Sequence, residues 1–174
     1  MGAEVAVVPE RVNAADVVVA RRIAIRAHQG QTYAGRPYFA AHVQAVAGRV
    51  ANLGYGYDEI CVAYLHDTVE DTDVTLADLA GRFPGHIVAA VDAITRRARP
   101  DGSKEGYFGE YLPRVLAVHL AAVAKRVDAS CNLAQCVIEG NDSMAGRYRK
   151  VIAAVDTAYP DIARRCAASR HTGT

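Results

Sequence analysis

The block from residue 66 to residue 71 contains the side chains whose types and spacing could do chemistry. It reads His66-Asp67-Thr68-Val69-Glu70-Asp71, and the apolar run 60–65 before it predicts a buried helix stem. Adjacent His66 and Asp67 can both turn toward one metal ion. Glu70 and Asp71 follow four residues later, which on a helix is one turn further along the same face. Several carboxylates this close together need a cation or a proton to offset desolvation and repulsion, so the block indicates a metal-dependent hydrolytic site.

Two further residues could complete this site, one on each side of the block in the sequence. His42 stands in front of the apolar stretch 43–53, and Asp128 lies late in a long apolar stretch. With His66 and Asp67 they offer two imidazoles and two carboxylates. This set suits manganese, iron or zinc, with positions left open for water and a phosphate oxygen. The spacing does not choose among these metals, and no Cys is positioned to compete.

Taken in order, His42, His66-Asp67 and Asp128 resemble the ligand pattern of the HD phosphohydrolase superfamily. The surrounding residues resemble the hydrolase domain of Rel/SpoT proteins and the stand-alone small alarmone hydrolases of the metazoan SpoT homologue class. The resemblance covers residues 15–155. Its matching segments are Ala27-His28-Gln29-Gly30-Gln31, Pro37-Tyr38, Val46-Ala47, His66 to Thr72, Arg82-Phe83, and Lys125, Asp128 and Asn132.

The resemblance implies an enzyme that removes the 3′-pyrophosphate of the guanosine alarmones ppGpp and pppGpp. It implies one divalent metal ion, most often Mn²⁺, with four ligands: His42, His66, Asp67 and Asp128. It also implies that Glu70 and Asp71 activate or position the attacking water and that Asn132 contacts the nucleotide. These roles agree with general chemistry, because a divalent ion lowers the pKa of bound water and a nearby carboxylate can accept its proton.

The residues that would bind the nucleotide depart from the family pattern. Relatives carry an Arg-Lys pair soon after Gly30-Gln31, whereas here Tyr33 could stack on a base but brings no charge. The two Arg positions that follow the family's Asp are Ala129 and Ala134 in this chain. The metal-binding pattern therefore matches while the nucleotide-binding pattern differs, so the sequence supports a metal-dependent phosphohydrolase better than it supports a guanosine substrate.

Six residues are expected to contact the substrate: Asn132, Lys125, Tyr33, Arg36, Gln135 and Arg147. Lys125 lies one helical turn before Asp128, so it either holds a phosphate or pairs with a carboxylate. Arg147 either belongs to a solvated helix face or closes over the substrate. A basic cluster, made of Arg96, Arg97, Arg99 and Lys104, is either a solvated loop or a rim that attracts anionic substrates.

Two alternative functions stay open. The first is an HD-type phosphohydrolase that acts on another purine nucleotide, such as ppApp or the 2′-phosphate of NADPH. The second is a nucleotide-binding regulator without turnover. A regulator of this kind should have lost a metal ligand or one member of the Glu70-Asp71 pair, and this chain keeps them all.

Composition limits the class of protein. A chain of 174 residues, 51% hydrophobic, predicts one domain with a real core. A net charge of +1 argues against a general nucleic-acid binder, and four Cys without a C-x-x-C pair argue against a disulfide scaffold. Since no apolar run reaches membrane-spanning length, we expect a cytoplasmic protein with a small phosphorylated nucleotide as partner and no nucleic acid or membrane. A homo-oligomer is left open.

The helical periodicity predicts an all-α, single-domain helical bundle with the metal site between helices. We expect an N-terminal arm over 1–12, the HD-type phosphohydrolase domain over 13–166 and a polar tail over 167–174. The expected helices cover 13–29, 38–52, 58–71, 75–83, 84–97, 110–134 and 142–159. Asn13 with Asp16 and Thr75 with Asp78 are expected to form capping boxes, Asp58 to cap the helix that carries His66, and Pro160 to break the last helix. No hairpin is expected.

Overall fold

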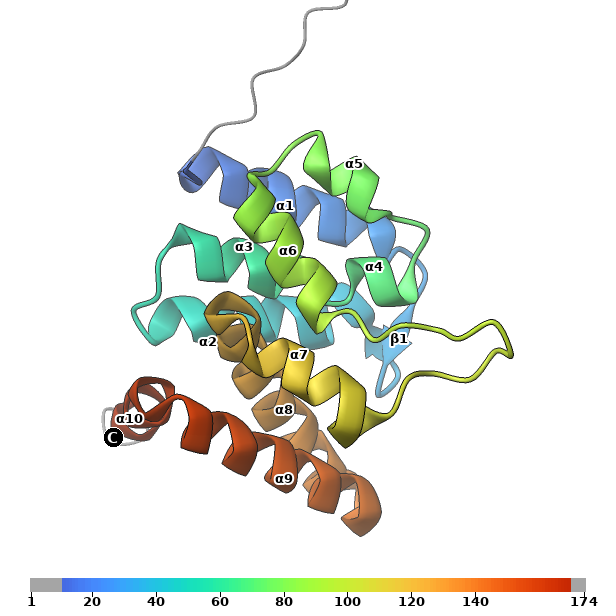
Figure 1. The fold of residues 1–174 in the computed structure, drawn as a ribbon, viewed down its shortest axis with the longest axis vertical. Helices are drawn as coiled ribbons and strands as arrows, with labels where there is room; N and C mark the ends of the chain where they lie inside the picture. Colours follow the sequence, from blue (N-terminus) through green and yellow to red (C-terminus); the bar gives the residue numbers. More distant parts are fainter. Residues whose placement is uncertain (1–10, 170–174) are drawn as a thin grey trace, which may run out of the picture.

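The computed structural model describes residues 11–169, which form a bundle of helices with one very small sheet (Figure 1). The helices are α1 (Ala14–Ala27), α2 (Gln44–Asn52), α3 (Tyr57–Leu65), α4 (Thr68–Asp71), α5 (Leu76–Ala80), α6 (Gly85–Ile94), α7 (Leu112–Leu116), α8 (His119–Glu139), α9 (Asp142–Ala158) and α10 (Pro160–Ala168). Two π-helical segments, Phe39–Val43 and Tyr107–Tyr111, lead into α2 and α7. The expected all-α class is confirmed. Residues 1–10 and 170–174 lie outside the described residues, so the division into arm, domain and tail stays a prediction.

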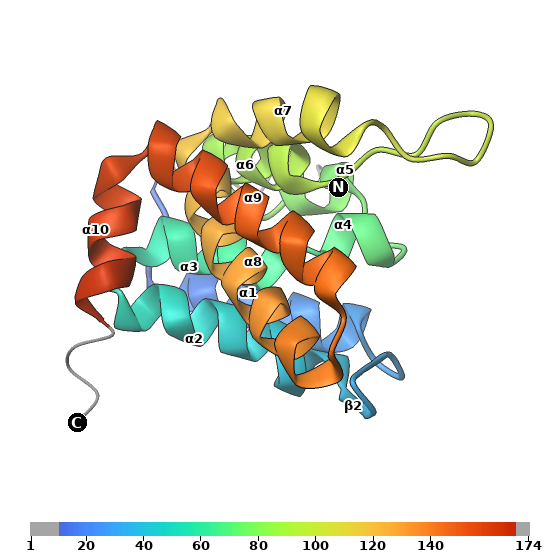
Figure 2. The same ribbon diagram turned by 90° about the horizontal axis from the view of Figure 1, so that it is seen from below.

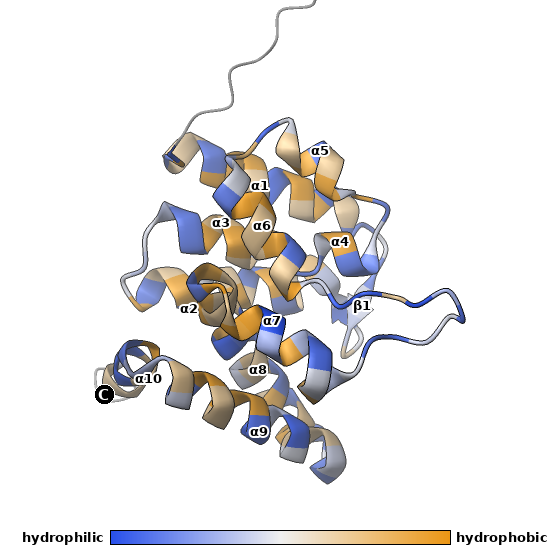
Figure 3. Cartoon of the chain, in the orientation of Figure 1, coloured by the Kyte–Doolittle hydropathy of each residue, from blue (hydrophilic) through white to orange (hydrophobic). Residues whose placement is uncertain are grey.

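The core forms around α3 and α8. Helix α8 contacts α2, α3 and α6, and α9 packs along its other side, as two views of the ribbon agree (Figure 2). The last five residues of α3, 61–65, are all buried, and so is the small-residue run 121–124 of α8. Small side chains let the two helices approach closely and bring their polar residues together. Apolar residues gather on the inward faces, while the loop between α6 and α7 is largely hydrophilic (Figure 3). No helix in residues 11–169 is both long and apolar enough to cross a membrane.

Local capping signals are correct at two helix starts and wrong at a third. The Asn13 side chain accepts a hydrogen bond from the Ala15 amide at 2.7 Å, and Asp16 completes the expected capping box. Thr75 and Asp78 do the same for α5. The expectation for Asp58 is wrong, because α3 begins after Gly56, whose amide donates to the Glu59 carboxylate at 3.0 Å.

The helix that carries His66 ends there and does not run on to Asp71, contrary to the single helix expected over 58–71. Two side chains take the last carbonyl groups of α3: His66 Nδ1 donates to Ala63 O at 2.8 Å, and Thr68 Oγ1 donates to Leu65 O at 2.7 Å. Side chains that bind backbone carbonyls in this way compete with the backbone N–H groups that would otherwise continue the helix. Glu70 and Asp71 therefore belong to the separate short helix α4.

Other expected boundaries also differ from the structure. The single helix expected over 110–134 is wrong, because the chain is extended at Val118 (φ −127°, ψ 110°) and α8 starts afresh after it. The last expected helix ends before Pro160 as predicted, because α9 stops at Ala158 and Tyr159 leaves the helical conformation (φ −133°, ψ 80°). Pro160 then stands in the first turn of a further helix, α10, which was not expected. The segment expected to be a loop forms a hairpin of β1 (Thr32–Tyr33) and β2 (Arg36–Pro37).

Candidate functional site

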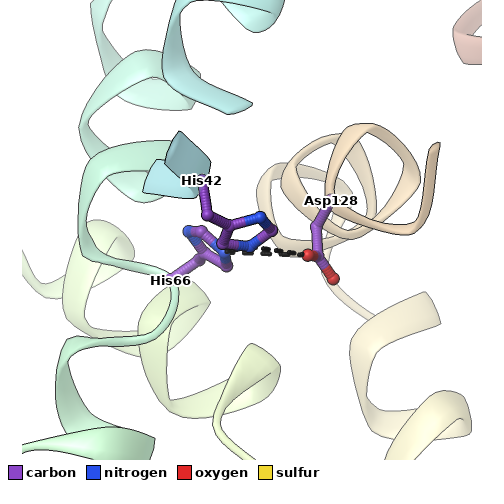
Figure 4. Close-up of side chains that lie close together, drawn as sticks. All are labelled: His42, His66 and Asp128. Carbon is purple, nitrogen blue, oxygen red and sulfur yellow. Dashed lines mark hydrogen bonds and ion pairs between the residues drawn. The ribbon is translucent and has the colours of Figure 1, made fainter. Parts of the chain in front are cut away.

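Four side chains from three separate segments of the sequence meet between α8, the end of α3 and the segment before α2. The Nε2 atoms of His42 and His66 lie 3.3 Å apart, and both face Asp128 on α8 (Figure 4). Asp128 Oδ1 is 3.2 Å from His42 Nε2 and 3.8 Å from His66 Nε2. Asp67 Oδ2 joins the group at 2.9 Å from His66 Nε2 and 3.5 Å from His42 Nε2. The ligand atoms of His42, His66 and Asp128 thus lie within 4.8 Å of one another, and Asp67 Oδ2 lies beside both imidazoles.

Hydrogen bonds orient three of these four side chains, while His42 Nδ1 is buried without a hydrogen-bond partner among the described residues. His66 donates through Nδ1 to the Ala63 carbonyl, so its Nε2 faces the centre of the group. Tyr38 donates its hydroxyl to Asp67 Oδ2 at 2.7 Å. Lys125 binds the outer oxygen of Asp128, Oδ2, at 2.8 Å, which turns Oδ1 toward the imidazoles. Such outer contacts are what orient metal ligands in proteins.

The spacing of the four groups fits one divalent metal ion. Two ligand atoms about 2.1 Å from one ion lie roughly 3.0 to 3.4 Å apart in neighbouring octahedral or tetrahedral positions. Of the five separations that involve an imidazole nitrogen, three lie at or near this range, from 2.9 to 3.3 Å, and two are wider, at 3.5 and 3.8 Å. Imidazole and carboxylate together suit manganese, iron or zinc.

Electrostatics also favour a cation at this point. Burial alone would lower the pKa of the His42 imidazole, but Asp128 and Asp67 raise it to about 10. Burial alone would raise the pKa of the Asp128 carboxyl, but Lys125 and the two imidazoles hold it well below its usual range. The buried carboxylates therefore stay ionised and require positive charge beside them, which a metal ion can supply in place of a proton.

Glu70 and Asp71 line the same cavity as the metal-binding candidates, although they reach it from α4. The Glu70 carboxylate is held by the loop between α6 and α7, since it accepts from the Arg96 amide at 2.8 Å and from Lys104 Nζ at 2.5 Å. The Asp71 carbonyl accepts from Gln31 Nε2 at 2.8 Å. Partial desolvation and the nearby carboxylates of Asp67 and Glu70 raise the pKa of Asp71 to about 6. Asp71 is thus largely ionised at neutral pH yet basic enough to accept a proton.

The cavity has a volume of about 310 Å³, and its walls are mostly polar. Four of the six expected substrate-binding residues line it, namely Asn132, Lys125, Tyr33 and Arg147. Arg36 and Gln135 lie outside this lining. Arg36 is exposed on β2, and the Gln135 amide donates to Glu139 on the outer part of α8. Their role in substrate binding stays a prediction.

Tyr33 is built into the site. Its ring stacks on the His42 ring with centroids 4.8 Å apart, and its hydroxyl donates to Asn132 Oδ1 at 2.8 Å. Asn132 in turn donates to Asp128 Oδ1 at 2.5 Å. Tyr33 therefore connects the hairpin to two of the four metal-binding candidates.

The basic cluster in the loop between α6 and α7 divides into two parts. Arg97 and Arg99 form ion pairs with Asp92 and Glu110 and are exposed, as a solvated loop would be. Lys104 binds Glu70, and Arg96 lines the cavity, as a rim would. Arg97 and Arg99 thus match the solvated-loop alternative, while Arg96 and Lys104 lie at the cavity, where an attraction for anionic substrates stays a prediction.

Sequence reasoning assigned no function to four of the tyrosines that line the cavity: Tyr38, Tyr107, Tyr111 and Tyr148. Tyr38 belongs to a segment that matches the family pattern, and Tyr148 follows Arg147, an expected substrate contact. Both facts are weak sequence signals for a place in the cavity. Tyr107 follows the polar loop, and Tyr111 stands in the first turn of the helix expected over 110–134, and nothing in the sequence marked either for the cavity. Their place in the wall follows from the π-helical turn 107–111, which the sequence did not predict.

Comparison with known proteins finds a family model described as "HD domain" that matches residues 20–107. A guanosine-3′,5′-bis(diphosphate) 3′-pyrophosphohydrolase of Aquifex aeolicus is 39% identical over 62 residues, which are 36% of this chain and 9% of that protein. The protein of the same description from Vibrio cholerae is 37% identical over 75 residues, 42% of this chain and 10% of that protein. The matched stretches are thus about a tenth of the length of these relatives.

A solved structure, described as a metazoan ortholog of SpoT that hydrolyzes ppGpp, is similar over most of the chain. The match has a TM-score of 0.68 at 16% identity and covers 89% of this chain and 97% of the other. At this identity the match shows a shared fold alone. It extends the similarity well beyond residue 107, where the family match ends.

Proposed function

We propose that this chain, which belongs to the HD-domain family, is a metal-dependent phosphohydrolase that removes the 3′-pyrophosphate of the guanosine alarmones ppGpp and pppGpp. The observation that carries the proposal is the convergence of two imidazole nitrogens and two carboxylate oxygens in a cavity that also contains Glu70 and Asp71. The names of the partial-length relatives support the choice of substrate.

His42, His66, Asp67 and Asp128 would hold the metal ion, for which we expect manganese. When bound, such an ion lowers the pKa of a bound water and neutralises charge on a phosphate oxygen. The chain's own contribution is to fix the ligand atoms. Lys125 and Asn132 hold the two oxygens of Asp128, and Tyr38 holds Asp67, so the site needs little rearrangement before the reaction.

Asp71 accepts the proton of the attacking water in this proposal. Its pKa of about 6 keeps it ionised above that pH and makes it a stronger base than an ordinary carboxylate. Glu70 is held on both oxygens by Arg96 and Lys104, so we assign it the positioning of the water and not the proton transfer. The cavity volume of about 310 Å³ suits a part of a nucleotide, such as its phosphates and ribose.

A second substrate is favoured by one specific observation. The hairpin contributes an aromatic ring, Tyr33, to the cavity but no cation, since Arg36 lies outside the lining. An aromatic face accepts any purine. We therefore keep ppApp and the 2′-phosphate of NADPH as alternative substrates. A regulator without turnover is disfavoured, because all four ligand candidates and both α4 carboxylates are present in one place.

A substrate panel tests the proposal. The purified, manganese-loaded chain is incubated with ppGpp, pppGpp, ppApp and NADPH, and released pyrophosphate and orthophosphate are measured separately. We expect pyrophosphate from ppGpp and pppGpp. Orthophosphate from NADPH, with no pyrophosphate from ppGpp or pppGpp, would replace the proposed substrate and keep the phosphohydrolase. No release from any of the four would contradict the proposed function.

A further inference from the structure

Two arginines in the cavity wall carry charge that no carboxylate of residues 11–169 balances. Arg96 donates its side-chain N–H groups to the backbone carbonyl of Glu105, at 3.0 and 2.7 Å. Arg147 donates through its Nη2 to the Met144 sulfur and forms no ion pair with a described carboxylate. A hydrogen bond to a carbonyl or a thioether satisfies a donor but leaves the positive charge in place.

Four other arginines on the same loop or in the bundle have carboxylate partners. Arg97 and Arg99 bind Asp92 and Glu110, Arg114 binds Glu105, and the buried Arg126 binds Asp156. Arg96 and Arg147 are the two arginines that line this cavity. Their charge is therefore available to something that enters it.

Both guanidinium groups lie against one ring. The Cζ atoms of Arg96 and Arg147 are 5.4 and 5.3 Å from the centroid of Tyr107, although Arg96 comes from the loop after α6 and Arg147 from α9. The Tyr107 hydroxyl is buried and has no hydrogen-bond partner among the described residues. Two like charges gathered at one ring repel each other, and an anion between or beside them would offset that repulsion.

This basic wall lies next to the metal-binding candidates. Lys125 Nζ is 2.8 Å from Asp128 Oδ2 and 5.8 Å from the centroid of the same Tyr107 ring. The Lys125 side chain therefore lies between the proposed metal ligands and the two arginines. Because Lys125 is already paired with Asp128, the arginines hold the unbalanced charge on this side.

We propose that Arg96 and Arg147 bind a second phosphate group of the substrate, beside the phosphorus that is attacked. The inference deepens the proposed function and rests on it for the identity of the attacked group. It explains how the chain can bind a polyphosphate although the hairpin lacks the expected cations. The second phosphate belongs either to the 3′-diphosphate that leaves or to the 5′-diphosphate that stays.

Binding measurements test this without turnover. Titration calorimetry on the manganese-loaded protein, with free metal held constant, compares inorganic pyrophosphate with orthophosphate and GDP with guanosine. Charge-assisted hydrogen bonds to a phosphate are among the stronger polar contacts. We expect Arg96→Gln and Arg147→Gln to weaken the binding of either pyrophosphate or GDP about 10- to 100-fold. The binding of orthophosphate and guanosine, which lack the second phosphate, should change little.

The chain offers a matched control for each arginine. Arg97→Gln removes a positive charge next to Arg96, and Arg149→Gln removes one two residues after Arg147. Both positions are exposed and lie outside the cavity lining. They should leave unchanged the preference for pyrophosphate over orthophosphate and the preference for GDP over guanosine. Arg96→Lys keeps the charge and should retain most of the preference. This variant separates charge loss from any distortion of the loop, which circular dichroism and thermal melting check in every variant.

The pair that responds identifies the source of the second phosphate. A lost preference for pyrophosphate over orthophosphate assigns the arginines to the leaving group, and a lost preference for GDP over guanosine assigns them to the 5′-diphosphate. Unchanged preferences in folded Arg96→Gln and Arg147→Gln would overturn the inference while ppGpp hydrolysis could still stand. Altered preferences in a chain that does not hydrolyse ppGpp would support the inference and overturn the proposed function.

Discussion

The Glu70 carboxylate accepts a hydrogen bond from Lys104 Nζ at 2.5 Å, across 34 residues of sequence. Its second oxygen accepts from the Arg96 amide at the start of the same loop. Residues near both ends of the loop between α6 and α7 therefore hold the Glu70 carboxylate in place. This contact makes the conformation of an exposed polar loop part of the geometry of the cavity.

Removal of either α4 carboxylate should stop turnover without loss of the metal ion. We expect Glu70→Ala and Asp71→Ala to keep metal and fold but to lose on the order of 100- to 10,000-fold in kcat, the usual value of acid–base help. Lys104→Ala should lower kcat less, because the Arg96 amide still holds Glu70. Asp92→Ala, on the outer side of α6, is the control. Near wild-type kcat in both α4 variants would assign these carboxylates to structure alone.

The pH dependence of kcat should follow Asp71. A base must be ionised, so with a pKa of about 6 its contribution is present above that pH and is lost as the pH falls through it. Asp67 and Glu70 raise this pKa, while Lys104 and His66 lower it, and a bound cation would lower it further. We therefore expect an acid limb with a midpoint at or below about 6. The limb should vanish from the residual activity of Asp71→Asn, and its persistence there would exclude Asp71 as the base.

Tyr33 should affect substrate binding more than the chemical step. We expect Tyr33→Ala to raise KM more than it lowers kcat, as lost uniform binding does, with modest discrimination between guanine and adenine in the wild type. Tyr33→Phe keeps the ring against His42 but removes the hydrogen bond to Asn132, so it separates stacking from anchoring. Strict guanine selectivity that survives Tyr33→Ala would point to other base-reading groups.

The ligand set can be tested by metal content alone. Each Ala substitution at His42, His66, Asp67 or Asp128 should strip the ion and abolish turnover, because it removes one of the four proposed ligands. Each of the two carboxylate oxygens lies within 3.8 Å of both imidazole Nε2 atoms. His119→Ala, on an exposed ion pair with Asp161, is the matched control and should keep a full complement of metal. Full occupancy in His42→Ala by elemental analysis would show that this set is wrong.

The sequence predicts features that depend on a few neighbouring residues. The capping boxes at Asn13 and Thr75 form as expected, because cap and partner lie three residues apart. The hairpin was missed because its turn places Ala34 at φ 49°, a conformation that alanine rarely adopts and that Asn-Gly usually signals. The break at Val118 was missed because nothing in the local sequence marks it.

The candidate site was predictable where motif residues carry it and not where distant segments meet. The convergence of His42, His66, Asp67 and Asp128 follows from the resemblance. The ion pair between Lys104 and Glu70 depends on how the twelve-residue loop 95–106 folds back toward α4. No local sequence pattern predicts that arrangement of the loop. The meeting of Arg96 and Arg147 at Tyr107 likewise requires α6 and α9 to be placed first.

The most direct test of the central claim is the release of pyrophosphate from ppGpp by the purified chain, measured with manganese, after chelation and after manganese is restored. We expect pyrophosphate and GDP as products, loss of the activity on chelation and its recovery when manganese is restored. A folded chain, shown by elemental analysis to hold one manganese ion, that releases no pyrophosphate from ppGpp would contradict it.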